Sequence, residues 1–226
     1  MSNLPQKEFV SYEFKYFFVS KYQEYNKKTA NYNIVNYDGL YIGEVKWFSS
    51  WRKYCFFPAP STVWDNKCLT EVTTFLDLIN KRHSIREYSE EPVSIEILNK
   101  LVEWAKLAPS SRNKKPCDFI VVTEKEMLSK LSQSKAAGSQ MLKNAGGAIV
   151  VTGDSSKSDV WVEDCSIAMT YLHLAAVDLG LGSCWIQIRN RKTADNSDSE
   201  KYIKELFGLK ENTEVLAVLS LGKIKS

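Results

Sequence analysis

The sequence has no long uninterrupted apolar stretch. No window approaches the roughly eighteen apolar residues without charges that a membrane-spanning helix needs. Near the N-terminus, Lys7, Glu8, Glu13 and Lys15 break up the apolar runs, so the pattern of a secretory signal peptide is also missing. We therefore expect neither a membrane span nor a secretory signal.

Cysteine is scarce and scattered. The chain has five cysteines, an odd number, and no two of them are spaced as CxxC. This argues against a disulfide framework and a structural zinc site, and it favours a protein of the reducing cytoplasm. Most of these side chains are expected to be small buried apolar groups. The cysteines are Cys55, Cys68, Cys117, Cys165 and Cys184.

The chain has only two histidines and a net charge of +3. We find no Ser-His-Asp set and no cluster of metal ligands, and His173 lies inside an expected long helix, where a packed residue is a simpler reading than a catalyst. Residues 1–64 carry 8 Lys/Arg against 5 Asp/Glu, whereas residues 65–226 carry 22 of each. So small an excess does not predict a nucleic-acid partner.

Aromatic residues, by contrast, are abundant and unevenly placed. Of 27 in the chain, 18 precede Asp65. So many large side chains must be buried in a small domain of their own or against a neighbour. Residues 34–57 alternate loosely around Asp38-Gly39, which predicts a hairpin or meander. We therefore expect an aromatic-rich module over residues 1–64 and a second domain over residues 65–226.

After residue 65 the pattern alternates between helix and strand. Asp65 or Asn66 is a suitable cap for the first helix, Ser94 for the second, and Gly180 and Gly182 are suitable C-caps for the long helix. Helices around a few apolar strands indicate an α+β or α/β sandwich. The expected helices are 66–80, 95–108, 124–133, 139–144, 162–179 and 199–207, and the expected strands are 117–123, 147–153, 183–188 and 214–221.

Three segments carry candidate chemistry, and each is weak by itself. Residues 81–88 place two arginines and a serine together, which suits an anion, although a solvated basic helix end explains them too. Residues 108–116 form a loop before a strand, where ligand sites are common, although an ordinary turn has the same composition. Residues 179–188 contain glycines and a tryptophan that can simply end a helix and fill a core.

Together, the three segments resemble the nitroreductase family. Residues 82–86, RHSIR, look like its RxSxR motif, and residues 109–116 are similar to its PSSxNxxP loop. Residues 178–186 match the end of its long helix and the strand that follows. The motifs stand in the family's order, and the resemblance covers about 70% of the chain, from Leu69 to the C-terminus.

The resemblance implies an α+β fold, a nitroreductase-like three-layer sandwich whose mostly antiparallel mixed sheet is flanked by helices, with a small N-terminal β-containing module. It also implies a homodimer with two FMN molecules at the subunit interface. Arg82 and Ser84 would then hold the phosphate and ribityl end, Arg86 would lie near flavin N1, and residues 109–113 would come from the partner subunit. The residues so assigned to the cofactor are Arg82, His83, Ser84, Arg86, Pro109, Ser110, Ser111, Asn113, Trp185, Ile186 and Gln187.

The implied activity is ping-pong hydride transfer. NAD(P)H reduces FMN at N5 and leaves, and a small-molecule acceptor such as a nitroaromatic or a quinone takes its place. Because the cofactor carries the chemistry, no catalytic side chain or metal is required. Two alternatives stay open: another flavin chemistry on this fold, such as dehalogenation, azoline oxidation or flavin fragmentation, and a flavin-binding sensory or interaction protein with little turnover.

The sequence departs from the family's pattern at two places. Lys114, Lys115 and Cys117 stand where the loop usually reads Gln-Pro-Trp, and the extra lysines predict a preference for an acidic acceptor or for the phosphates of NADPH. After Gly222 the usual tail with basic residues is absent, so either Lys225 takes its place or FMN binds more weakly.

The N-terminal region carries a second resemblance. Residues 47–69 resemble a small uncharacterised module of bacterial and phage proteins. Its aromatic and basic side chains suit stacking on single-stranded nucleic acid, but a packing module is the simpler expectation.

Overall fold

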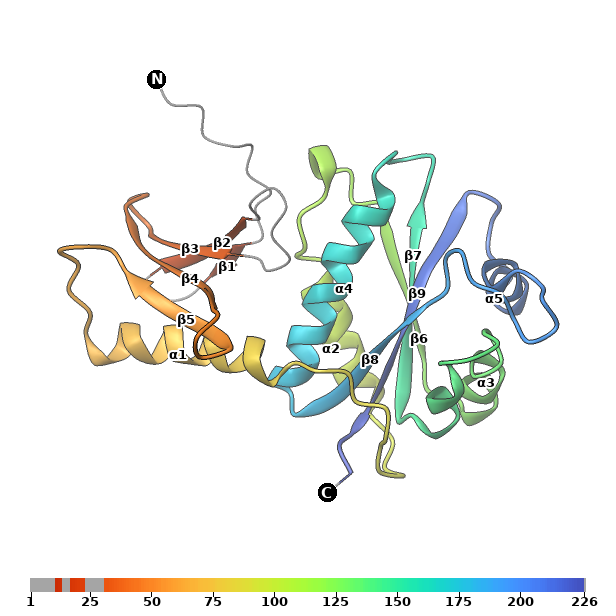
Figure 1. Ribbon diagram of the computed structural model, residues 1–226. Coiled ribbons are helices and arrows are strands. Elements are labelled where there is room, and N and C mark those ends of the chain that lie inside the picture. The colour runs from red at the N-terminus through yellow and green to blue at the C-terminus, as the bar shows by residue number, and fades with distance from the viewer. Residues whose placement is uncertain (1–10, 14–16, 23–30, 226) are drawn as a thin grey trace. The chain divides into compact units, whose positions relative to one another are not determined.

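The computed structural model describes residues 11–13, 17–22 and 31–225, which belong to two compact units, residues 1–81 and 82–226. Each unit has a sheet of its own (Figure 1). Among the described helices, none is long and apolar enough to cross a membrane.

The first unit is an antiparallel meander followed by one helix. Its strands are β1 (Ser11–Glu13), β2 (Phe17–Tyr22), β3 (Asn31–Asn36), β4 (Tyr41–Phe48) and β5 (Lys53–Pro58), in that spatial order, and the helix is α1 (Asn66–Lys81). The turn expected at Asp38-Gly39 joins β3 to β4: Gly39 has φ +80°, and the Leu40 amide donates to Asn36 Oδ1 at 2.9 Å. The expected hairpin is therefore part of a five-stranded sheet.

One face of this sheet packs on α1. Ile34 and Val45 are fully buried and share a core with Val72 and Phe75 of the helix. The helix begins where the cap was expected, because the Cys68 amide donates to Asp65 Oδ1 at 2.8 Å. Helix α1 thus shares its core with the meander, and the division between compact units follows Lys81 and not residue 64.

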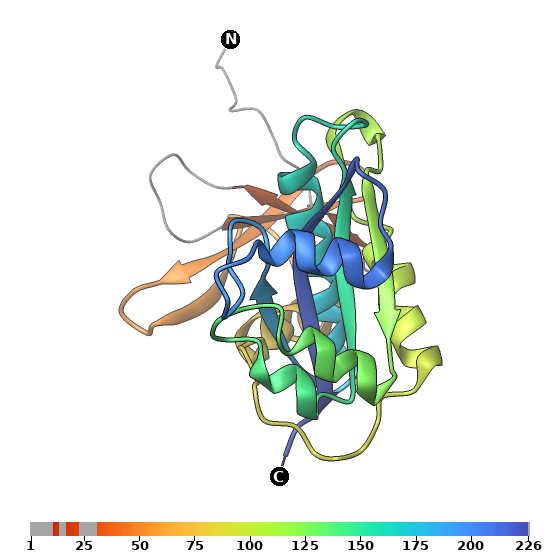
Figure 2. The same ribbon diagram turned by 90° about the vertical axis from the view of Figure 1, so that its right-hand side faces the viewer.

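The second unit is a three-layer α+β sandwich, which confirms the expected fold class. Its four strands lie in the order β6-β7-β9-β8, and all neighbours are antiparallel. Helices α2 and α4 cover one face of the sheet, and α3 and α5 cover the other (Figures 1 and 2). The elements are α2 (Ile95–Ala105), η1 (Ser111–Asn113), β6 (Cys117–Val122), α3 (Lys125–Leu131), η2 (Gln140–Asn144), β7 (Gly147–Asp154), α4 (Trp161–Asp178), β8 (Leu181–Gln187), α5 (Ser199–Phe207) and β9 (Thr213–Lys223).

The two central strands are buried on both faces, which explains their nearly continuous apolar sequence. Successive residues of a strand point to opposite faces. Ile149 of β7 and Leu219 of β9 accordingly join the core under α2 and α4, whereas Val150 and Val218 join the core under α3 and α5. The sheet is therefore held between two packed helical layers.

The expected cap of α2 and the first glycine expected after α4 are found, although α2 ends at Ala105 and not at residue 108. The Ile97 amide donates to Ser94 Oγ at 3.4 Å, and Gly180 has φ +70° after α4, as expected of a cap and a C-terminal glycine. Gly182, expected to be a second C-cap, lies instead in β8, opposite Gly222 of β9. The strand starts early because the pairing with β9 begins at Leu181.

Candidate functional site

The segment that follows α1 in sequence lies along β8. The Ile85 amide donates to the Ser183 carbonyl at 2.9 Å, and the Tyr88 hydroxyl donates to the Ile85 carbonyl at 2.7 Å. The glycines make room for this approach: a Cβ at Gly182 would stand 2.7 Å from Ile85, and one at Gly222 would stand 2.6 Å from the Tyr88 ring. The first and third sequence segments are thus brought together.

The backbone of β8 offers hydrogen-bond donors beside this segment. The Ser183 carbonyl accepts from Ile85, so it points away from β9. Because the direction of backbone groups alternates along an antiparallel strand, the amides of Trp185 and Gln187 point to the same open edge. No other described residue accepts from them outside the β8–β9 ladder. Unpaired amides of this kind are ready-made donors for a ligand.

The side chains of β8 divide between the site and the core. Trp185 Nε1 donates to Gln187 Oε1 at 2.9 Å, and Gln187 Nε2 donates to the Arg189 carbonyl at 3.0 Å. These bonds fix both side chains on one face of the strand. Ile186 points to the other face and is buried in the core under α3 and α5. By the same alternation, the amide and carbonyl of Ile186 point to β9, so Ile186 does not face the open edge.

A neutral histidine lies behind the edge strand. His173 of α4 is buried, and its Nδ1 is 2.8 Å from Ser183 Oγ. Burial, with a smaller contribution from the charge of Arg82, lowers the pKa of His173 to about 4. The imidazole is therefore uncharged at neutral pH and packed in the helix, in line with the structural reading expected for it.

Positive charge gathers at the start of this segment. Arg82 is half-buried, and Arg86 is exposed with His83 and Ser84. Neither arginine forms an ion pair with any carboxylate in the part of the chain that the structure describes. Two guanidinium groups without a protein counter-charge suit a phosphate, which they bind through paired hydrogen bonds.

The second sequence segment, the loop 109–116, lies elsewhere. The Ser111 amide donates to Asp164 Oδ1 at 2.8 Å, in the first turn of α4, and Asp164 also accepts from Ser158 Oγ at 3.0 Å. Figure 1 shows η1 near one end of α4 and the start of β8 near the other. An 18-residue helix is about 27 Å long. One chain therefore does not bring this loop to the start of β8, where the segment 82–86 lies.

Three residues position the site although no role was predicted for them from the sequence. Asp164 is a buried carboxylate that anchors the loop, Ser158 supports it, and Tyr88 bonds to Ser220 Oγ at 2.7 Å. A carboxylate in the first turn of a helix usually indicates only a favourable dipole interaction. Only the tertiary fold shows that this one binds a loop 53 residues away.

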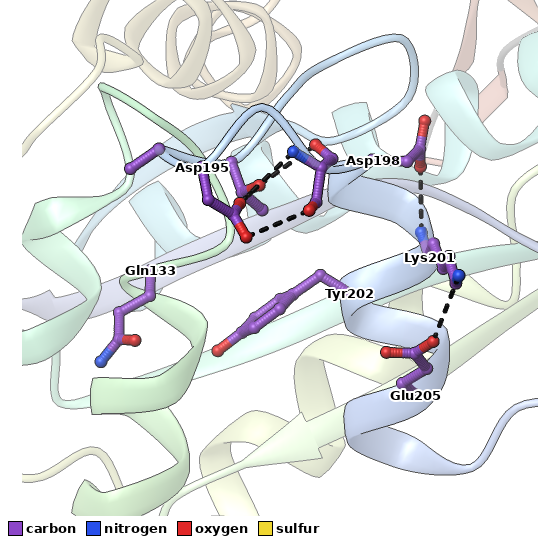
Figure 3. Close-up of a pocket in the computed structure, with 9 residues that line it drawn as sticks. Gln133, Asp195, Asp198, Lys201, Tyr202 and Glu205 are labelled. Atoms are coloured by element: carbon purple, nitrogen blue, oxygen red, sulfur yellow. Dashed lines mark hydrogen bonds and ion pairs between the residues drawn. The ribbon is translucent and has the colours of Figure 1, made fainter.

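A hollow of about 620 Å³ lies on another part of the second unit. Figure 3 shows its lining, which includes Gln133, Lys201 and Tyr202. Its carboxylates have structural tasks: Asp198 caps α5 by accepting from the Glu200 and Lys201 amides, and Asp195 accepts from Thr193 and Ser197. None of the predicted site residues lines this hollow.

Comparisons with known proteins agree with this geometry. The chain matches the family described as the Nitroreductase family over residues 79–139 and 128–223. It is 44% identical over 151 residues to an Archaeoglobus fulgidus protein provisionally named NADH dehydrogenase/NAD(P)H nitroreductase, a match that covers 65% of this chain and 83% of that protein. A similarly named protein of Methanothermobacter thermautotrophicus is 37% identical over 150 residues, covering 65% and 75% of the two chains.

Solved structures show the same likeness. An FMN-dependent nitroreductase from Clostridium difficile superposes with a TM-score of 0.64 at 45% identity, covering 66% of this chain and 87% of that one. The second unit thus defines an oxidoreductase of the nitroreductase type. The chain belongs to the nitroreductase family. The family match begins at residue 79, so it leaves the aromatic-rich meander outside.

Proposed function

We propose that this protein is an FMN-dependent oxidoreductase that takes hydride from NAD(P)H and delivers it to a nitroaromatic, quinone or related acceptor in two successive half-reactions. The observation that carries the proposal is the position of the segment 82–86 beside the open edge of β8. A cluster of cationic and hydroxyl groups and a row of free amides there suit the two ends of one flavin nucleotide.

The residues present fit FMN by their donor chemistry. Arg82, Ser84 and Arg86 would hold the phosphate, ribityl and pyrimidine side, and the amides at Trp185 and Gln187 would face the isoalloxazine. Bound FMN supplies the acceptance and release of hydride at N5. The protein keeps His173 neutral behind this edge, so the nearby positive charge is that of the arginines.

A second copy of the chain would complete the site. The loop 109–113 lies near the opposite end of α4 from the start of β8, where the segment 82–86 lies. Two chains related by a two-fold axis would bring the loop of each to the edge strand of the other. This separation supports a homodimer with flavin at the interface, to which Pro109, Ser110, Ser111 and Asn113 of the partner subunit contribute.

The first test is an absorbance spectrum of the purified protein, before and after anaerobic NADH or NADPH. We expect a flavin spectrum that bleaches with at least one nucleotide and returns when an acceptor is added. A flavin that binds but does not bleach would favour the sensory reading. A protein that stays colourless after incubation with FMN would refute the proposal.

A variant that lacks both arginines, compared with a control variant, tests where the phosphate binds. Replacing both Arg82 and Arg86 by Gln removes charge-assisted hydrogen bonds, so FMN affinity should fall about tenfold or more. Arg191→Gln serves as the control, because the guanidinium of exposed Arg191 donates to the neighbouring Asn190 carbonyl and lies outside the segment 82–86. Equal flavin affinity in the double variant and the control would place the phosphate elsewhere.

Dehalogenation is a second candidate, because deiodinases are among the relatives. An iodotyrosine deiodinase of Rattus norvegicus is 37% identical over 59 residues, and one of Haliscomenobacter hydrossis is 25% identical over 114 residues. Each match covers half of this chain or less. Release of iodide from iodotyrosine by the reduced protein, measured against quinone reduction by the same sample, separates the two activities.

For the first unit, we propose a packing module related to the uncharacterised bacterial and phage module named above, in a protein of the cytoplasm. The alternative is stacking of single-stranded nucleic acid on exposed aromatic residues such as Trp51. A filter-binding assay with oligonucleotides at low and high salt decides this point. Affinity that falls as salt rises would favour nucleic acid.

A further inference from the structure

The loop 109–116 carries a group of cations for which the proposed reaction has no use. Arg112, Lys114 and Lys115 are exposed, and none of them forms an ion pair with any described carboxylate. Several other lysines of this unit do have an acidic partner: Lys106 Nζ, for example, is 2.8 Å from Glu103 Oε1. Among the described residues, the three charges of the loop thus have no ion-pair partner.

The loop holds these cations on a fixed backbone. Its start is tied to α4 by the bond from the Ser111 amide to Asp164, and its end is tied to β7 by the Asp154 amide, which donates to the Pro116 carbonyl at 2.9 Å. Within the loop, the Lys115 amide donates to Ser110 Oγ at 2.8 Å. An ordered backbone lowers the entropy lost when the side chains bind a ligand.

The backbone conformation of the loop also indicates a role for its cationic side chains in ligand binding. Arg112, Asn113 and Lys115 have φ of +51°, +55° and +46°, in the left-handed region that glycine occupies at little cost. Arginine and lysine are strained there, and strained residues gather at ligand-binding sites. Cationic side chains therefore stand where a glycine would relieve the strain.

We propose that Arg112, Lys114 and Lys115 bind an anionic group, a phosphate or a carboxylate, of a molecule that enters the flavin site, and so determine its specificity. This inference rests on the proposed function, because the loop reaches the flavin only in the dimer. Two sources can supply the anion: the 2′-phosphate of NADPH and the acidic substituent of an acceptor.

The test uses the FMN-loaded protein with all three cations changed to glutamine (Arg112→Gln, Lys114→Gln, Lys115→Gln). Glutamine removes the charge and keeps a side chain at the strained positions. The matched control changes Lys125, Lys143 and Lys210 to glutamine. These lysines are also exposed and form no ion pair with the described carboxylates, so the control loses the same net charge.

Four probes distinguish the sources of the anion. Adenosine 2′,5′-bisphosphate is compared with adenosine 5′-monophosphate, and 4-nitrobenzoate with nitrobenzene, by calorimetric titration of the oxidised protein. We expect either the bisphosphate or the nitrobenzoate to lose about tenfold in affinity in the loop variant, while its counterpart without that anionic group stays within about twofold. The loss should shrink at high ionic strength, because salt screens exposed charges. The probe that weakens identifies the source.

Kinetics give a second readout. If the anion is the 2′-phosphate, the ratio of kcat/KM for NADPH to that for NADH should fall about tenfold in the loop variant and stay unchanged in the control. Equal affinities of the wild-type protein and the loop variant for the bisphosphate, and likewise for the nitrobenzoate, would overturn the inference. So would an equal loss in the control, which would indicate a general effect of net charge.

The outcomes separate this inference from the proposed function. Flavin content and bleaching are recorded on the same samples. A wild-type protein that binds no flavin refutes the proposed function, and this inference falls with it. Normal flavin content and bleaching in the loop variant, with unchanged anion binding, refutes this inference alone.

Discussion

The two sheets of this protein differ in how they are covered. In β4 of the first unit, buried and more exposed residues alternate, as expected of a sheet with one face packed on α1. In β7 of the second unit, seven of the eight residues are buried. The candidate site lies on the second sheet, which helices hold on both faces. Precise placement of ligand groups needs such a rigid support.

The two units also differ in how their aromatic residues are packed. In the first unit, Phe48, Phe57 and Trp51 cluster edge to face without full burial, and Lys46 lies 4.5 Å above the Phe57 ring. In the second unit, aliphatic side chains fill both cores. Substitutions should therefore be costly in the second sheet and mild on the outer side of the first.

The largest effect is expected in the centre of the second sheet. Leu219→Ala leaves a cavity under α2 and α4 and should lower the free energy of unfolding by about 2–5 kcal/mol. Urea denaturation measures the loss, with Val63→Ala, at a site 98% exposed, as the control. If both variants unfold at the same urea concentration, the side chain of Leu219 does not contribute to a tightly packed core in the second sheet.

Acid should weaken the second unit through His173. Its pKa is about 4 in the folded protein and about 6.5 when unfolded, so the unfolded chain gains the proton first. Stability is full above pH 6.5 and falls toward pH 4, by at most about 3 kcal/mol. Glu200, whose pKa is raised to about 7, acts in the opposite direction as the pH falls from 7.

Comparing the wild type with His173→Gln isolates this effect, since Glu200 and the other carboxylates are present in both. We expect thermal unfolding of the variant to depend less on pH between 6.5 and 4. Parallel curves for the two proteins over that range would mean that the imidazole is protonated in the fold.

A smaller effect is expected where the segment 84–88 meets the sheet. Gly222→Ala forces the Tyr88 ring to move, although its hydroxyl is fixed by Ile85 and Ser220, and should cost about 1–3 kcal/mol. FMN affinity should fall with it, since the arginines lie on the same segment. Gly208→Ala is the control. Its φ of +61° strains the backbone of an alanine, but a Cβ added there would have no atom within 4 Å. Its flavin affinity should stay unchanged.

The smallest effect is expected on the first sheet. Trp51 is 66% exposed in the turn between β4 and β5, so Trp51→Ala should change the free energy of unfolding by no more than about 0.5 kcal/mol. Flavin content and turnover should also be unaffected. Loss of either would show that the first unit takes part in the chemistry.

Local patterns predicted much of the fold. The caps at Asp65 and Ser94 and the turn at Gly39 follow from short-range chemistry, and the structure confirms each of them. The role of Gly182 was mistaken because its requirement is tertiary: Ile85, almost a hundred residues earlier, approaches the strand there. The assignment of a glycine to a cap or to a strand depends on which segment packs against it.

The site was predictable only in part for the same reason. The motifs name Ser111, but not the buried Asp164 that positions it. Ser183 and Asp164 gain their roles from partners distant in sequence, Ile85 in one case and Ser111 in the other. The flavin contacts themselves stay a prediction until the measurements above are made.

The edge strand β8 has one further consequence, for solubility. Among the described residues of the second unit, backbone hydrogen bonds reach its outer side only at Ser183, so the amides of Trp185 and Gln187 beyond it are unpaired donors on an edge strand. Exposed edges are templates for intermolecular pairing and aggregation. Cofactor and partner subunit would cover this one. Protein made without enough flavin should therefore precipitate more readily, and added flavin should keep newly made chains in solution.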